Sequence, residues 1–141
     1  MILKPKVTKY KKQFRGHYKI KSKAGCFIVH GTYGLKATSS GRINGIQIES
    51  ARVAISKFIK KVGKLWIRIF PNIPITKKPI EVRMGKGKGE VCDWIFKVGI
   101  GRILFEIQGT TEEVARAAFK AASYKLGIDT RFVHRIMDLI C

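Results

Sequence analysis

The sequence predicts a single α+β domain with a largely antiparallel sheet, two helices and an extended basic N-terminal arm. Two stretches of helical period are separated by several short runs rich in β-branched and aromatic residues. These runs mostly follow one another through short links, which is typical of antiparallel strands. The 141 residues suit one domain, which we divide into an arm at 1–23, a core at 24–136 and a tail at 137–141.

The arm carries nine lysines and arginines and no acid. It has too few aliphatic residues to form a helix or strand of its own, so a partner is expected to order it. Its aromatic residues alternate with cations, a combination that suits RNA because cations neutralise phosphates and flat rings stack on unpaired bases. The alternative is a solubilising tail. The candidate RNA-binding residues are Lys4, Lys6, Lys9, Tyr10, Lys11, Lys12, Phe14 and Arg15.

The predicted strands are the short runs at 26–37, 65–70, 91–98, 102–107 and 128–136. Two glycines inside the first run indicate a bulge or a hairpin, and a turn is expected at 38–41. Only a Gly-Ile-Gly link at 99–101 separates the third and fourth runs, so they are predicted to form a hairpin. Residues 72–80 contain two prolines and are expected to form a loop with short extended pieces.

Helices are predicted at 45–62 and 111–126, where apolar residues recur every three or four positions. The first stripe is Ile48, Ala51, Ile55, Phe58, Ile59 and Val62, and the second is Val114, Ala118, Phe119, Ala122 and Leu126. A glycine follows each helix and is expected to end it. The residue pairs with capping-box spacing are Asn44 with Gln47 and Thr110 with Glu113.

The net charge of +20 makes a polyanion the natural partner, because such a charge destabilises the isolated domain. Residues 1–80 hold 19 lysines and arginines and a single acid, whereas residues 81–141 hold 10 and 8. The N-terminal half is therefore the expected binding half. The apolar runs are too short to span a membrane, and the apolar start is too short for a signal peptide.

A glycine-lysine loop at 85–89 is the second candidate RNA-binding segment. It matches neither nucleotide-binding fingerprint, because no Ser or Thr follows its lysines and a strand, not a helix, is expected after it. Alternating glycines allow positive φ and close backbone approach, while the lysines offer charges to phosphates. The alternative is a solvated hairpin tip. The candidate residues here are Arg83, Met84, Gly85, Lys86, Gly87 and Lys88, to which we add Lys36 and Arg42.

No catalytic or metal-binding pattern is apparent. Several acids, among them Glu106 on a strand that alternates apolar and polar residues, are expected on solvated faces or at helix caps. Cys26 and His30 would share a face of the first predicted strand but lack two further zinc ligands at the usual spacing. We therefore expect no enzyme activity, metal or cofactor. Three widely spaced cysteines suit a reducing compartment and not a disulfide framework.

With these pieces placed, residues 5–133 resemble the large-subunit ribosomal protein sixteen family of bacterial and organellar type. The segments that carry the resemblance include PKVTKYKKQFRG at 5–16, GKLWIRIFPNIPIT at 63–76, KPIEVRMGKGKGE at 78–90 and EEVARAAFKAASYKLGI at 112–128. The resemblance implies an α+β fold and binding to large-subunit rRNA near the peptidyl-transferase centre and the A-site tRNA path. It also implies contact with 5S rRNA, A-site tRNA and neighbouring large-subunit proteins, and a role in late subunit assembly and translation.

The resemblance assigns the deep RNA contacts to the arm and the glycine-lysine loop, and an orthosomycin antibiotic site to the helix face with Arg52 and Lys57. Two positions depart from the family pattern, since Val7 and Val53 stand where arginines are usual. The frequent isoleucine and lysine point to an AT-rich genome, so an organelle, either mitochondrion or plastid, is expected before a bacterial cytoplasm. The alternative function is a free-standing RNA-binding protein or chaperone.

Overall fold

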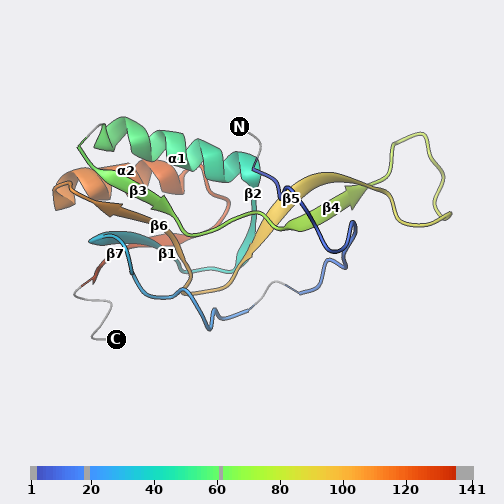
Figure 1. Cartoon of the computed structure of the whole chain (residues 1–141), viewed down its shortest axis with the longest axis horizontal. Coiled ribbons are helices and arrows are strands. Elements are labelled where there is room, and N and C mark those ends of the chain that lie inside the picture. The colour runs from blue at the N-terminus through green and yellow to red at the C-terminus, as the bar shows by residue number, and fades with distance from the viewer. Residues whose placement is uncertain (1–2, 18–19, 61, 136–141) are drawn as a thin grey trace.

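The computed structural model describes residues 3–17, 20–60 and 62–135 (Figure 1). The tail after Arg135, for which we expected local packing, lies outside the described residues. The elements in chain order are β1 (Tyr33–Ala37), β2 (Gly41–Asn44), α1 (Gly45–Ile59), β3 (Lys64–Ile67), β4 (Ile73–Lys77), β5 (Glu90–Val98), β6 (Ile103–Gln108), α2 (Glu112–Ser123) and β7 (Thr130–His134).

The strands form two sheets, one of four strands in the order β3-β6-β1-β7 and one of three in the order β2-β5-β4. All pairings between these strands are antiparallel. The α+β class and its antiparallel character are therefore confirmed, with two sheets in place of one. Both helices lie along one face of the four-stranded sheet, and the β4–β5 ribbon projects from the domain to a long loop (Figure 1).

The predicted hairpin of 91–98 with 102–107 is wrong, because β5 and β6 belong to different sheets. The link between them is held by other segments: the Ile100 N–H donates to Ile20, and the Gly101 N–H donates to Ala37. Gly101 has a φ of +89°, which lets the chain turn from one sheet into the other. The hairpin that does form joins β4 to β5, and residues 78–89 are its connecting loop.

The first helix is shorter than predicted and ends at Ile59, where Lys60 takes a positive φ of 53°. Ile48, Ala51, Ile55 and Ile59 are buried as predicted. Phe58 is 44% exposed, and Val62 lies beyond the helix and is 81% exposed, so the end of the predicted stripe is wrong. The Gln47 side chain accepts the backbone N–H of Asn44 at 2.9 Å, which confirms this part of the predicted cap.

The second helix begins one residue later than predicted. Thr111, and not Thr110, is the N-cap residue, and no capping side-chain hydrogen bond forms there. Ala115 is buried, whereas Val114, which was predicted to be buried, is 37% exposed, so this position of the predicted stripe is wrong. The other residues of the predicted stripe, Ala118, Phe119, Ala122 and Leu126, are buried in the core between the helices and the four-stranded sheet.

The first predicted strand covers only 33–37, and residues 20–32 form an irregular segment that we call the strap. Cys26 and His30 therefore do not share a strand face. The sequence indicated a bulge or a hairpin in this strand, and the structure has a shift in the pairing of β1 with β6 between Leu35 and Lys36. The strap lies on the sheet face away from the helices, where Ile28 packs so closely on Gly34 that a Cβ there would lie 2.9 Å from the isoleucine side chain (Figure 1).

Glu106 is fully buried under the strap, so its expected place on a solvated face is wrong. Its carboxylate accepts the backbone N–H groups of Val29, His30 and Gly31 at 3.3, 2.6 and 2.9 Å. The Arg68 guanidinium pairs with the same carboxylate. Burial by itself would raise the pKa of Glu106, but the three backbone donors and Arg68 outweigh it and lower the pKa. The carboxylate thus fastens the strap to the sheet.

Candidate RNA-binding surface

The β4–β5 loop is exposed from Glu81 to Lys88, which includes most of its glycine-lysine stretch. Gly85, Lys86 and Gly87 all have positive φ, at 100°, 52° and 87°. Left-handed conformations cost little for glycine, which explains two of the glycines in this loop. A Cβ built on Gly85 or Gly87 would meet no atom of the described chain within 4 Å, so any close approach at these glycines must involve a partner.

The arm lies against this loop through two reciprocal contacts. The Lys12 ammonium donates to the Lys88 carbonyl at 2.8 Å, and the Lys88 ammonium donates to the Gln13 carbonyl at 2.5 Å. Lys88 also lies 5.4 Å from the centre of the Phe14 ring. Two segments that are about 75 residues apart in the sequence therefore form one surface, which we call the arm–loop surface.

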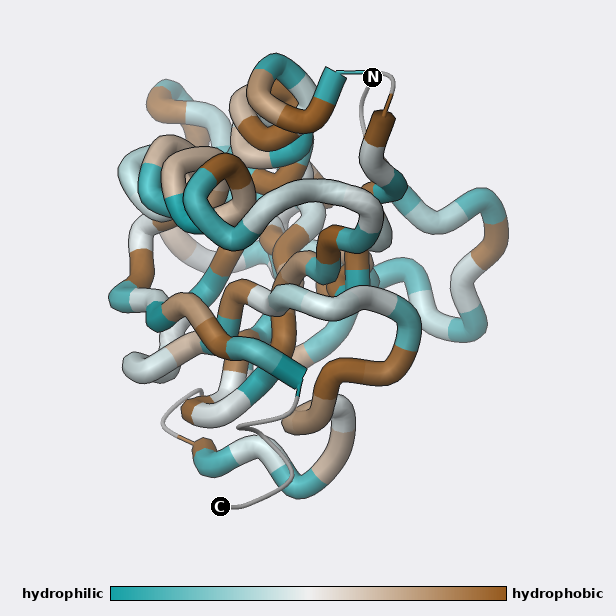
Figure 2. Tube along the Cα trace, turned by 90° about the vertical axis from the view of Figure 1, so that its left-hand side faces the viewer, coloured by the Kyte–Doolittle hydropathy of each residue, from teal (hydrophilic) through white to brown (hydrophobic). Residues whose placement is uncertain are grey.

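The arm–loop surface is strongly cationic. Residues 3–17 contain no acid, and the loop at 78–89 contains only Glu81. Its contacts described above run from ammonium groups to backbone carbonyls and a ring, which leaves the positive charges unneutralised. Phe14 is 94% exposed and Met84 90% exposed, so flat and apolar side chains are presented beside the cations. Figure 2 shows the arm as a mostly hydrophilic segment beside the domain.

The remaining predicted RNA-binding residues are distributed over the domain. Lys4 and Lys6 follow Leu3, which packs against the core next to the start of α1. Lys36 lies on β1 of one sheet and Arg42 on β2 of the other, so the fold does not group them with the loop. Both side chains are half-buried.

The predicted antibiotic face on α1 also has an internal partner. Arg52 binds Glu49 with two hydrogen bonds of 2.9 and 2.8 Å. This hydrogen bonding lowers the pKa of Glu49 and raises that of Arg52, so the pair is charged at neutral pH. Lys57 is exposed in the last turn of the helix.

Sequence reasoning missed a second cationic site, where Lys21 and Lys23 of the strap meet Lys97 and Arg102 around one pocket. The first two belong to the recognised charge run, but the other two are about 75 residues further along the chain. No local pattern could pair them, because the strap is brought there by the buried carboxylate of Glu106 and by a parallel bridge between Lys21 and Ile100.

Other kinds of site are not found in the described part of the chain. No group of three histidine, cysteine, aspartate or glutamate side chains lies close enough to hold a metal ion among residues 3–17, 20–60 and 62–135. Over these same residues, neither helix has the length and apolar character needed to cross a membrane.

The fold and this surface define a class of small polycationic α+β proteins with an exposed, strongly cationic surface. Within that class, the family model described as ribosomal protein L16p/L10e matches residues 5–133. The chain belongs to this family, whose members are structural proteins of the ribosome and not enzymes.

Three relatives illustrate the match. Proteins of Rhizobium etli strain CIAT 652 and Allorhizobium ampelinum are each 51% identical to this chain, and one of Agrobacterium fabrum is 50% identical. Each alignment covers 137 residues, which is 97% of this chain and 100% of the relative. All three are named large ribosomal subunit protein uL16. These relatives are bacterial, so they do not support the expected organelle and fit the bacterial alternative.

Proposed function

We propose that this chain is a structural component of the large ribosomal subunit that binds rRNA through the arm–loop surface. The observation that carries the proposal is the reciprocal contact of Lys12 and Lys88, which unites two cationic segments. The names of the relatives support the large subunit as the place of assembly.

The surface is suited to folded RNA in three ways. Its lysines and arginines can neutralise phosphates that converge in a folded RNA. Tyr10 and Phe14 are 60% and 94% exposed and can stack on unpaired bases. Gly85 and Gly87 add no side chain on the outside of the loop, so an RNA backbone can approach the peptide closely.

The finer placement follows from the family resemblance. We propose that the loop reaches toward the peptidyl-transferase centre and the A-site tRNA path, and that the domain also contacts 5S rRNA and neighbouring proteins. The β4–β5 ribbon projects from the domain, which supports this placement because its loop could contact RNA at a distance from the rest of the protein (Figure 1). The α1 face with Arg52 and Lys57 is proposed as the antibiotic-site face.

Sedimentation separates this function from that of a free-standing RNA chaperone. We expect the chain in a lysate of its source to travel with the large subunit in a sucrose gradient and to resist a high-salt wash. Resistance is expected because an embedded surface is shielded from the screening that weakens exposed charges. A chain that stays at the top of the gradient, or leaves the subunit at once in salt, would refute the structural role.

The double variant Lys86→Ala/Lys88→Ala tests the loop. Each lost phosphate contact removes close to one unit from the dependence of log affinity on log salt concentration, so the slope should fall by about two units at most. The measurement is a salt titration of binding to a large-subunit rRNA fragment.

A control for this variant is Lys120→Ala/Lys125→Ala, which removes two exposed lysines in the less basic half of the chain. An unchanged slope in the loop variant, or an equal fall in both variants, would mean that the loop is a solvated hairpin tip.

A further inference from the structure

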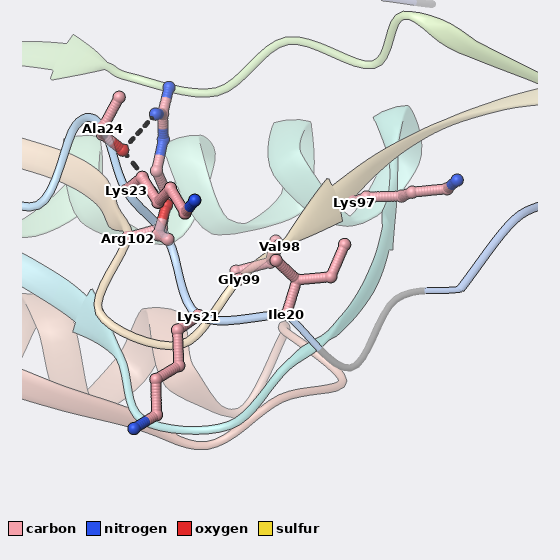
Figure 3. A pocket seen from close by; sticks show the side chains of 9 residues that line it. Ile20, Lys21, Lys23, Ala24, Lys97, Val98, Gly99 and Arg102 are labelled. Atoms are coloured by element: carbon pink, nitrogen blue, oxygen red, sulfur yellow. Dashed lines mark hydrogen bonds between the residues drawn. The ribbon is translucent and has the colours of Figure 1, made fainter.

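We propose that the pocket between the strap and the β5–β6 link holds a single unpaired nucleotide of the bound RNA. The inference rests on the proposed function and adds a site to it. The pocket has a volume of about 370 Å³. It is lined by Ile20, Lys21, Ser22, Lys23, Ala24, Lys97, Val98, Gly99 and Arg102 (Figure 3).

The pocket is preformed because backbone hydrogen bonds fix two of its walls. Ser22 donates to the Ile100 carbonyl at 2.9 Å, and Ile100 donates back to the Ile20 carbonyl at 2.9 Å. Gly99 completes the junction, since a Cβ there would lie 2.9 Å from the Ile20 oxygen. The volume is at the lower end of the range for small-ligand sites, roughly 300–1,000 Å³, so it suits a nucleotide and excludes an RNA helix.

The chemistry of the lining favours a nucleotide. Four cationic residues line the pocket and no acidic residue does. The lining also contains the exposed apolar residues Ile20 and Ala24. A nucleotide combines an anionic phosphate with a flat, largely apolar base, and therefore uses both parts of this lining.

Arg102 is held in place before any ligand arrives. Its Nη1 donates to the Ala24 carbonyl at 2.6 Å (Figure 3). The guanidinium also lies 5.7 Å from the centre of the Phe96 ring. Gly25 lies beside it with a φ of +68°, which favours glycine, and a Cβ there would lie 2.3 Å from Nη1. A fixed guanidinium loses little conformational freedom when an anion binds, whereas the lysines of the strap can adjust to the position of the phosphate.

The pocket adjoins residues 3–17, the part of the arm that carries the predicted RNA-binding residues. The Lys97 ammonium lies beside Gly16, at 2.8 Å from the position that a Cβ would occupy there. Lys97 also pairs across the strands with Arg42, a residue already predicted to bind RNA. An RNA strand that follows the arm can therefore place one unpaired nucleotide in the pocket.

The test uses the full-length protein and a large-subunit rRNA fragment that contains 4-thiouridine. Ultraviolet crosslinking should join the RNA to residues 20–24 or 97–102. The variant Ala24→Phe adds a large side chain to the pocket lining without changing the charge, and it should abolish these crosslinks. It should also weaken binding about fivefold or more, as expected for the loss of one stacked base, while the salt slope stays constant.

The control is Ala117→Phe, at an exposed position on α2, which should leave crosslinks and affinity unchanged. Thermal unfolding of both variants checks that the domain is intact. A second pair, Lys21→Ala/Lys23→Ala against Lys120→Ala/Lys125→Ala, measures the phosphate part of the site, and the pocket pair should lower the salt slope by about one unit more.

The outcomes separate this proposal from the proposed function. If the protein binds the rRNA but no crosslink falls in the pocket, or if Ala24→Phe behaves like Ala117→Phe, the nucleotide site is refuted and the arm–loop surface stands. A loss of affinity only in the lysine pair would indicate a phosphate contact without a base, and would also refute it. If the unaltered protein does not bind the rRNA, both proposals fail.

Discussion

Replacing Glu106 with glutamine is expected to reduce the free energy of unfolding by about 3 kcal/mol or more. Removal of one partner from a buried ion pair leaves the other charge uncompensated, at a cost of roughly 3–5 kcal/mol. In this variant Arg68 would lose its carboxylate partner. The amide NH₂ group of glutamine would also replace one of the two oxygens that accept hydrogen bonds from three backbone N–H groups of the strap, so donors would face a donor. Urea unfolding at neutral pH measures the effect.

A matched control is Glu113→Gln, which makes the same chemical change at an exposed position of α2. Its effect should stay within about 0.5 kcal/mol, as for most surface substitutions. A loss below about 1 kcal/mol for Glu106→Gln would contradict the role assigned to this carboxylate.

The same carboxylate predicts a pH dependence of the unfolding free energy. The pKa of Glu106 is lower in the folded than in the unfolded chain, so its contribution is fully present above the ordinary glutamate pKa. It is lost as the pH falls through the lowered pKa of the folded state. The glutamine variant should lack this part of the acid destabilisation. The difference in unfolding free energy between the variant and the unaltered protein should therefore be smaller at low pH than at neutral pH.

Neutralising the arm is expected to have the largest effect on RNA binding. Six substitutions to glutamine, at Lys4, Lys6, Lys9, Lys11, Lys12 and Arg15, keep the chain length and remove six charges. If each residue contacts one phosphate, the dependence of log affinity on log salt should flatten by roughly four to five units. Leu3 is retained, so that its contact with the core is kept.

The measurement is again a salt titration with the large-subunit rRNA fragment. The control for net charge carries glutamine at the five exposed cations of residues 81–135 that lie outside the β4–β5 loop, and the two changes in slope are compared per charge removed. These five are Arg116, Lys120, Lys125, Arg131 and Arg135. A slope equal to that of the unaltered protein would identify the arm as a solubilising tail.

Local patterns were sufficient to predict most elements of the fold. Apolar periodicity located both helices, because one face of each is buried against the same sheet. Pairing partners were harder to predict: β5 and β6 are separated by only the four residues Gly99 to Arg102, yet they lie in different sheets. The hydrogen bonds that decide this come from Ile20, Ser22 and Ala37, and no short sequence window contains them.

The same limit applies to the site. The charge runs singled out the arm and the loop as candidate RNA-binding segments, because clustered cations are visible in the sequence without knowledge of the fold. The sequence analysis placed Glu106 on a solvated face, because alternating apolar and polar residues in a strand predict one buried and one solvent-exposed face of the sheet. The strap covers that second side, and its position depends on a contact across about 75 residues. The strap pocket was missed for this reason.

The contact between Lys12 and Lys88 has a consequence for the order of events in assembly. Each ammonium is held by a carbonyl of the other segment, so the two segments keep their charges while lying side by side. In the free protein their mutual repulsion opposes this arrangement. An RNA strand that neutralises one segment removes part of that repulsion and makes the other segment easier to bring in. By linkage, capture of either segment strengthens capture of the other by the same factor, so the two should engage the RNA as one cooperative unit.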